Sequence, residues 1–324
     1  MIQIGILGAG GMGTVHLNNY ARMEDCKVVA LCDPSPAAEE TARKGGLTLY
    51  TEIEKMLADS EVQLVDVCTP TFLHRTHVMA ALNAGKYVIC EKPLALTRAD
   101  AQEMFALARE KHVQIFVGQV LQFAPSSKVL HSLVKSGEYG KMLDAQFLRL
   151  SACPRWVKNG WLFDKSKSGH LPFDLHIHDL DFLVSLLGKP DSYTYTATGR
   201  EGLDYKEHYR FSYRFGETTV CAEAAWYNAD IPFTATWRVY FEQAVVIFDG
   251  VTLTAYQFDH EPRVFDIEET LKIPTGINVP PTGMFYEELS SFLHTVETQP
   301  TAPSPREEEL LTVIGILEQV VKES

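Results

Sequence analysis

The chain has 324 residues, 46% of them hydrophobic, which is enough to bury the cores of two ordinary domains. Its 29 Lys and Arg against 42 Asp and Glu give a formal net charge of -13, which argues against nucleic acid or an anionic membrane as a general partner. The six cysteines include no C-x-x-C pair, so they indicate neither a disulfide framework nor a zinc site.

The first predicted strand spans residues 2–7 and ends in the turn Gly8-Ala9-Gly10-Gly11-Met12-Gly13. A basic leader and a long apolar run are both missing before it, so we expect a cytoplasmic protein. This G-x-G-x-x-G spacing between a strand and a helix is typical of dinucleotide binding. Gly8 would make the tight turn, Gly10 would let the backbone approach a pyrophosphate, and Gly13 would let the helix pack closely on the strand. The helix N-terminus would then bind the phosphates.

Asp33 follows the second predicted strand, residues 28–32. Its carboxylate is placed to accept hydrogen bonds from both hydroxyls of an adenosine ribose and would repel a 2′-phosphate, which favours NAD over NADP. Alternatively, Asp33 only caps a helix, because Ser35-Pro36 directly after it is typical of a helix start.

Residues 1–120 alternate short apolar strands with helical segments, which predicts a parallel sheet wound on both faces by helices. The other expected strands are 48–50, 64–68, 87–90 and 113–118. The expected helices lie near 37–44, after a capping box at 51–54, between Thr69-Pro70 and residues 83–85, and from Thr97 onward.

Beyond this region the hydrophobic period becomes two, as in residues 208–215, which predicts an antiparallel sheet with unlike faces. The further expected strands are 219–226, 234–241, 244–248 and 251–258, followed by amphipathic helices over 284–298 and 306–322. We therefore predict an α/β protein with a dinucleotide-binding domain over 1–120. A second domain would span 121–324, with a final helix able to dock back on the first.

Ligands of an open parallel sheet bind at the carboxyl ends of its strands. Besides the glycine turn, Thr69-Pro70 with His74 and Glu91-Lys92-Pro93 lie at such ends. Lys92 stands on a backbone stiffened by proline, and its ammonium could hydrogen-bond a substrate oxygen and favour its deprotonated form. The alternative is an ordinary surface lysine before a loop.

A second group of candidates is Asp174, His178 and Asp181, whose spacing places them on one helix face. An imidazole is suited to take the proton of an alcohol whose carbon loses a hydride, and Asp174 could orient it or bind a substrate hydroxyl. Alternatively, His178 is simply satisfied by a nearby carboxylate. His176, His178 and Asp179 are metal-type ligands, but rings two residues apart diverge on a helix, so we expect no bound metal.

Together these motifs resemble the glucose-fructose oxidoreductase and inositol dehydrogenase family of NAD(P)-dependent enzymes. The resemblance covers nearly the whole chain and includes the glycine turn with His16, Thr69-Pro70-Thr71-Phe72-Leu73-His74, Glu91-Lys92-Pro93, and Asp174 with His178 and Asp181. The Glu-Lys-Pro triplet combined with a later Asp-x-x-x-His is much more specific than either motif alone.

The resemblance implies a Rossmann domain followed by an α/β domain whose large, mostly antiparallel sheet has one open face, able to pair subunits into a homodimer or homotetramer. It implies NAD as cofactor, with NADP as the alternative. The cofactor-binding residues would be Gly8, Gly10, Gly11, Met12, Gly13, Asp33, Thr69, Pro70, His74, Glu91, Lys92 and Gln119. The substrate-binding residues would be Lys92, Gln119, Arg155, Trp156, Trp161, Asp174, His176 and His178.

Two departures from the family pattern leave the substrate open. Ser168-Gly169-His170 stands where relatives often have a glycine run, and residues 119–123 lack an arginine or asparagine that many relatives carry. The leading hypothesis is a cytoplasmic NAD-dependent oxidoreductase that acts on a sugar, cyclitol or related polyol. His178 would be the acid/base, Lys92 would polarise the reacting oxygen, and Asp174 would support both. The alternatives are an NAD(H)-binding sensor without turnover and an NAD-dependent glycosidase that uses transient oxidation.

Overall fold

The computed structural model describes residues 1–155 and 157–324, which form two compact units. The first unit comprises residues 1–123 and 269–307, and the second comprises residues 124–268 and 308–324. A segment from far downstream therefore packs with the N-terminal region. A functional division near residue 120 stays a prediction.

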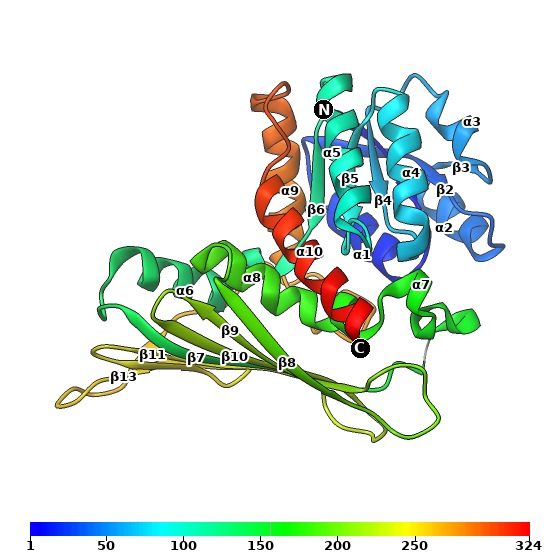
Figure 1. Ribbon diagram of the computed structural model, residues 1–324. Helices are drawn as coiled ribbons and strands as arrows, with labels where there is room; N and C mark the ends of the chain where they lie inside the picture. The colour runs from blue at the N-terminus through cyan, green and yellow to red at the C-terminus, as the bar shows by residue number, and fades with distance from the viewer. Residues whose placement is uncertain (156) are drawn as a thin grey trace. The chain divides into compact units, whose positions relative to one another are not determined.

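Six parallel strands form the sheet of the first unit, in the order β3-β2-β1-β4-β5-β6 (Figure 1). The strands are β1 Ile2–Leu7, β2 Cys26–Cys32, β3 Thr48–Tyr50, β4 Leu64–Val67, β5 Tyr87–Glu91 and β6 Ile115–Gly118. The helices between them are α1 Gly11–Tyr20, α2 Ala37–Gly45, α3 Ile53–Leu57, α4 Thr71–Asn83 and α5 Arg98–Lys111. This order reverses between β1 and β4, as in the dinucleotide-binding doubly wound fold, so the predicted parallel sheet is confirmed.

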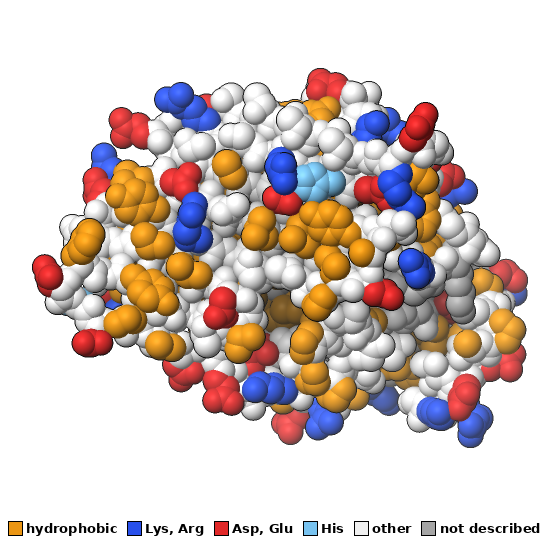
Figure 2. Space-filling view, turned by 90° about the horizontal axis from the view of Figure 1, so that it is seen from below, with side chains coloured by type: hydrophobic (Ala, Val, Ile, Leu, Met, Phe, Trp, Pro, Cys, Tyr) orange, Lys and Arg blue, Asp and Glu red, His pale blue; other side chains and the backbone are white. Residues whose placement is uncertain are grey.

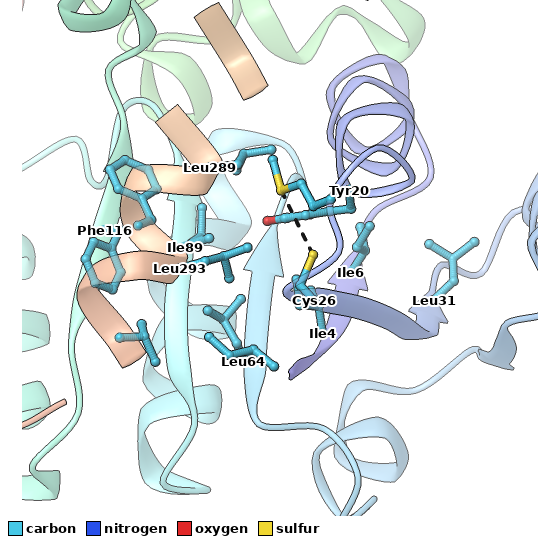
Figure 3. Close-up of a cluster of buried hydrophobic side chains, with 14 of the residues drawn as sticks. Ile4, Ile6, Tyr20, Cys26, Leu31, Leu64, Ile89, Phe116, Leu289 and Leu293 are labelled. Atoms are coloured by element: carbon cyan, nitrogen blue, oxygen red, sulfur yellow. Dashed lines mark hydrogen bonds between the residues drawn. The ribbon is translucent and has the colours of Figure 1, made fainter. Parts of the chain in front are cut away.

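The core of the first unit is completed by helix α9, Met284–Thr298. Leu289 and Leu293 of α9 pack into the same buried cluster as Ile89 and Phe116 of the sheet (Figure 3). The amphipathic pattern predicted this helix, but not its partner, because periodicity shows that a face is apolar without showing what covers it.

Two predicted helix starts had different outcomes. The side chain of Thr97 accepts a hydrogen bond from the backbone N–H of Asp100, so α5 begins where predicted. The capping box at residues 51–54 was wrong, because α3 has the extended residue Glu52 at its N-cap and no side-chain cap. The helix is only five residues long, so packing rather than a cap holds it.

The second unit contains an eight-stranded sheet in the order β14-β13-β12-β11-β7-β10-β9-β8. The strands are β7 Met142–Ala152, β8 Ser192–Thr198, β9 His208–Phe215, β10 Thr218–Tyr227, β11 Thr234–Phe241, β12 Val245–Phe248, β13 Leu253–Tyr256 and β14 Arg263–Phe265. Only β7 and β10 pair in parallel, so the predicted mostly antiparallel sheet is confirmed.

Helices α6 (Pro125–Ser136) and α8 (Ile177–Leu187) lie on one face of this sheet (Figure 1). In β9 the side chains of Phe211 and Tyr213 are buried, whereas Arg210 and Arg214 are exposed, which confirms the two-residue period. The pattern did not predict β7, β8, β14 or α6. Helix α10, Glu307–Glu323, ends the chain. Among the described residues, no helix is both long and apolar enough to cross a membrane.

We predict that Leu293→Ala lowers the free energy of unfolding by about 2–5 kcal/mol, because the side chain is fully buried between α9 and the sheet. The measurement is urea denaturation followed by circular dichroism. His294→Ala is the matched control, since this neighbour on the same helix is exposed, and we expect a change within about 0.5 kcal/mol. Equal effects of the two substitutions would contradict the packing of α9 described above.

Candidate functional site

The three glycines of the first turn differ in what surrounds them. A Cβ added to Gly8, whose φ is +97°, would lie 2.8 Å from the carbonyl oxygen of Cys68, and one added to Gly13 would lie 1.9 Å from that of Gly8. The packing of the chain therefore requires glycine at both positions. Apart from its chain neighbours, a Cβ added to Gly10 would meet no atom of the described residues within 4 Å, so this side of the turn is open.

The open turn leads directly into α1, which has Gly10 at its N-cap and no side-chain cap. The N–H groups of the first helical turn are thus left for another acceptor, and the first turn carries no acidic residue that would repel an anion. An open backbone surface beside uncapped N–H groups fits the pyrophosphate of a dinucleotide.

Asp33 joins the glycine turn to the end of β2. Its Oδ2 accepts a hydrogen bond from the N–H of Ala9 at 2.8 Å, and its Oδ1 accepts one from the N–H of Ser35 at 2.7 Å. The alternative that Asp33 only caps a helix is wrong, because helix α2 has Pro36 at its N-cap and no side-chain cap. Each carboxylate oxygen can accept more than one hydrogen bond, so these contacts also hold the group in place for a ribose diol.

His74 connects two loops at the carboxyl edge of the sheet. Its Nδ1 lies 2.7 Å from the carbonyl oxygen of Pro93, and its Nε2 lies 2.7 Å from that of Thr69. The ring is buried, and this burial lowers the pKa of His74. His74 thus lies between the Thr69 and Pro93 loops, with a carbonyl oxygen beside each ring nitrogen, and a neutral ring donates a hydrogen bond to one of them.

Glu91 and Lys92 at the end of β5 have different surroundings. Glu91 is buried, and its Oε1 lies 3.1 Å from Nε2 of His16, which in turn contacts Asp66 through Nδ1 at 2.7 Å. Lys92 is only partly buried. Of the two residues, Lys92 is therefore the one whose side chain is more accessible to a ligand.

Gln119 follows β6 and is buried, and its Oε1 has no hydrogen-bond partner in the described part of the chain. A buried acceptor without a donor is costly, which favours a bound donor group at this edge. Gln119, Lys92, Thr69 and the glycine turn all follow strands of the same parallel sheet.

In the second unit, burial singles out two of the predicted residues. Every residue from 168 to 184 is buried except Asp174 and His178. A π-helical segment, Pro172–His176, precedes α8. Since a π-helix has more residues in each turn than an α-helix, side chains four apart align more nearly there. Asp174 and His178 are thus the partly open side chains of an otherwise buried helix. Asp181, predicted on the same face, is buried.

Two contacts fix the rotation of this helix on its own sheet. The ring of His176 stacks on Phe211 with centroids 3.8 Å apart, and its Nε2 lies 2.7 Å from the hydroxyl of Tyr213. Arg149 of β7 donates two hydrogen bonds to Asp179, from Nε at 2.9 Å and from Nη2 at 2.7 Å. Both pairs are buried, so His176 and Asp179 face the sheet.

The environment of His176 argues against its predicted substrate contact. Burial, followed by the nearby charge of Arg149, lowers the pKa of His176 to about 3, so the ring is neutral at physiological pH. Together with the stack on Phe211, this makes His176 part of the packing. Of the remaining predicted substrate contacts, Arg155 is exposed and Trp161 is partly buried, while Trp156 lies outside the described residues.

The structure also brings together residues that sequence reasoning did not combine. His16, Asp66 and Cys68 place ligand-type atoms within 4.8 Å of one another. The 2.7 Å contact between His16 and Asp66 has the length of a hydrogen bond, and an ion pair explains the group without a metal. Ile277, from the downstream segment, lies close to Gly11: a Cβ added to Gly11 would be 3.1 Å from Cγ2 of Ile277. No periodicity signals either association.

Comparisons with known proteins match two family models. Residues 2–119 match the model described as the oxidoreductase family with an NAD-binding Rossmann fold, and residues 128–247 match the GFO/IDH/MocA C-terminal domain. D-glucoside 3-dehydrogenase of Escherichia coli is 32% identical over 201 residues, covering 58% of this chain and 55% of that protein. Levoglucosan dehydrogenase of Pseudarthrobacter phenanthrenivorans is 29% identical over 202 residues, covering 58% and 52%. The matched segment thus spans little more than half of each relative.

The fold comparison extends over the full length. The structure of a levoglucosan dehydrogenase in complex with NADH aligns with a TM-score of 0.83 at 20% identity, covering 99% of this chain and 96% of the other. A putative NADPH-dependent oxidoreductase from Desulfitobacterium hafniense aligns with a TM-score of 0.87 at 15% identity. These likenesses show the fold.

We predict that Gly10→Ala leaves the melting temperature unchanged but weakens NADH binding by about tenfold or more, because the new methyl group enters space that is open in the protein alone. Gly13→Ala is the comparison, since its methyl group would collide with the backbone at Gly8 and should lower stability as well. Differential scanning fluorimetry and NADH fluorescence titration measure the two effects. Unchanged NADH affinity in Gly10→Ala would remove the glycine turn from the binding site.

Proposed function

The chain belongs to the GFO/IDH/MocA oxidoreductase family, and we propose that it is an NAD-dependent dehydrogenase acting on a secondary alcohol carbon of a sugar, cyclitol or related polyol. The observation that carries the proposal is the exposure pattern of residues 168–184, in which only Asp174 and His178 remain partly open. Acid/base and hydroxyl-binding groups at those positions suit alcohol chemistry. The relatives named as D-glucoside and levoglucosan dehydrogenases support a sugar as the substrate class.

The first unit supplies the cofactor site in this proposal. The backbone at Gly10 and the N-terminus of α1 would bind the pyrophosphate, and Asp33 would bind the adenosine ribose. The negative charge of Asp33 favours NAD over NADP, because a 2′-phosphate would be repelled. The unsatisfied Oε1 of Gln119 supports a donor such as a carboxamide N–H at the same edge of the sheet. When bound, NAD⁺ supplies the acceptor for the hydride.

The side chains handle the oxygen and its proton. His178 would take the proton of the reacting hydroxyl during oxidation and return it during reduction, which requires an unprotonated ring at the start of oxidation. The ammonium of Lys92 would donate a hydrogen bond to the same oxygen and stabilise negative charge that develops on it. Asp174 would orient the imidazole or bind a neighbouring hydroxyl.

We predict that Lys92→Gln and His178→Asn each lower kcat by about 100-fold or more while NADH affinity stays near that of the wild type. The assay follows NADH absorbance with NAD⁺ and a panel of sugars and polyols, and in the reverse direction with the corresponding ketones. His294→Asn, an exposed histidine on α9, is the control and should keep full activity.

Wild-type turnover in both variants would reject the proposed roles. If the wild-type protein turns over no member of the panel in either direction, the result would instead favour an NADH sensor. Cleavage of glycosides without added NAD, by protein that copurifies with the cofactor, would favour the glycosidase alternative.

We further propose that a second copy of the chain covers the open face of the eight-stranded sheet. Strand register places apolar side chains from five strands on this face, because each pairs directly with another residue of the same face. They are Leu148, Tyr240, Val245, Ile247, Tyr256 and Val264. Figure 2 shows hydrophobic side chains gathered on the left of the view from below. Such a patch is more typical of an interface than of a solvated face.

We predict that Tyr240→Glu shifts the protein from dimer or tetramer toward monomer, because it places a charge within this patch. Light scattering coupled to size-exclusion chromatography measures the mass. Phe258→Glu is the control, since this residue is almost fully exposed in the turn after β13 and should not change the mass. A wild-type protein that runs as a monomer would refute the proposed pairing.

A further inference from the structure

A chain of hydrogen bonds runs from helix α1 to the backbone of Lys92, buried around His16 and partly buried at Lys92. Nδ1 of His16 lies 2.7 Å from Oδ2 of Asp66, and its Nε2 lies 3.1 Å from Oε1 of Glu91. The other oxygen of that carboxylate, Oε2, accepts the N–H of Lys92 at 3.1 Å. His16 and Asp66 are fully buried, and Glu91 is 7% exposed.

The contacts of His16 require both of its ring nitrogens to carry protons. An ionised carboxylate only accepts hydrogen bonds, so a ring that contacts two of them must donate twice, and only the imidazolium form does so. Burial acts against this charge, but the charge of Asp66 and the hydrogen bond to it outweigh the effect of burial and raise the pKa of His16 well above 6.5.

The other groups around the ring are accounted for. Tyr20 of α1 donates its hydroxyl to Oδ2 of Asp66 at 2.8 Å, and Sγ of Cys68 lies 3.4 Å from Nδ1 of His16. Burial raises the pKa of Tyr20 and of Cys68, so both stay neutral. The ring of Phe285 from α9 lies 6.4 Å away and adds no charge. Among the described residues, the acidic side chains that contact the ring of His16 are therefore those of Asp66 and Glu91.

We propose that His16 is a positioning residue for Lys92. Its two N–H groups tie Glu91 to Asp66 and thereby hold the carboxylate of Glu91 in the orientation that accepts the backbone N–H of Lys92. The position of the Lys92 backbone is then set by hydrogen bonds to the interior of the sheet, and not by the conformation of the following loop alone. This role rests on the proposed function of Lys92 at the reacting oxygen.

Two further features of the first unit fit this role. Gly118 lies directly opposite Glu91 on β6, and a Cβ there would come within 3.1 Å of Oε1, so glycine leaves the space that the carboxylate occupies. On the far side of Lys92, Nδ1 of His74 contacts the carbonyl oxygen of Pro93 at 2.7 Å. Lys92 therefore lies between Glu91 and Pro93, each of which contacts a buried histidine. Because the backbone on both sides of Lys92 is restrained, the range of positions open to its ammonium is narrower.

The test compares His16→Gln, Glu91→Gln and the double variant in the full-length protein. Glutamine at position 16 carries both of its N–H donors on one nitrogen, so it cannot replace donors that lie at two separate ring nitrogens. Glutamine at position 91 has one acceptor oxygen in place of the two that contact His16 and the N–H of Lys92. Each single variant should therefore lower kcat by about tenfold to 100-fold, with KM for NAD⁺ near that of the wild type. Because the two residues act through one path, the double variant should be no slower than the slower single variant. Additive losses, or an unchanged kcat in His16→Gln, would overturn the proposal.

A second perturbation reaches Glu91 without changing any charge. Gly118→Ala should displace the carboxylate of Glu91 and lower kcat in the same direction as His16→Gln. Val296→Ala, in the core cluster of α9, is the control for lost stability and should leave kcat unchanged. A loss of kcat in Val296→Ala equal to that in Gly118→Ala would overturn the proposal, because general destabilisation would then explain both.

Two readouts do not depend on turnover and separate this inference from the proposed function. Imidazole ¹⁵N spectra of the wild type at pH 7.5 should show both nitrogens of His16 protonated, and amide hydrogen exchange at Lys92 should be about tenfold faster in His16→Gln than in the wild type. A neutral His16, or unchanged exchange at Lys92, would overturn the positioning role even if the enzyme is active. If no alcohol is turned over, the proposed function fails, and these two measurements still decide the geometry.

The charge of His16 also determines how its contribution to the stability of the fold changes with pH. Its folded-state pKa is raised, so its contribution to stability is complete below about pH 6.5 and is lost as pH rises through the folded-state value. The difference in melting temperature between the wild type and His16→Gln should therefore shrink at alkaline pH. A difference that grows with rising pH would contradict the imidazolium.

Discussion

The close approach of helix α1 to strand β1 is the constraint on which the first unit depends. A Cβ at Gly13 would lie 1.9 Å from the carbonyl oxygen of Gly8, so the helix can sit against the strand only because both residues are glycine. This close packing has two consequences for the rest of the unit. The uncapped N-terminus of α1 faces open space beside Gly10. His16, one turn further along the helix, lies between Asp66 of β4 and Glu91 at the end of β5.

The polar residues at the carboxyl edge of the sheet differ in how much of their hydrogen-bonding capacity the protein itself uses. Glu91 and His74 were predicted to bind the cofactor, yet their polar atoms are engaged by His16, Lys92, Thr69 and Pro93. Burying such groups is costly unless each is paired, and paired groups of this kind rigidify the backbone around them. Gly10 and the partly buried Lys92 therefore lie next to an interior that has little freedom to move.

The helix around residues 172–187 of the second unit also combines buried residues that contact the sheet with residues that stay partly exposed. His176 and Asp179 are turned toward the sheet by a stack on Phe211 and a double hydrogen bond from Arg149. Residues one or two positions away from these anchors along the helix point elsewhere, as His178 does, and the π-helical segment aligns Asp174 with His178 on the more exposed side. The anchoring residues are titratable types like those they position. For that reason residue type alone did not separate His176 from His178.

The amino-acid sequence by itself determined the strand and helix periods, the glycine turn, the acid at Asp33 and the positions of Lys92, Asp174 and His178 in the chain. These features are local, because a side-chain period or a turn is specified by neighbouring residues. Only the tertiary structure decided that α9 completes the first core, that Glu91 faces His16, and that His176 packs inside while His178 stays partly open. Each of these depends on residues far apart in the chain, and a pattern of types shows that a polar or apolar group needs a partner without showing which one folding provides.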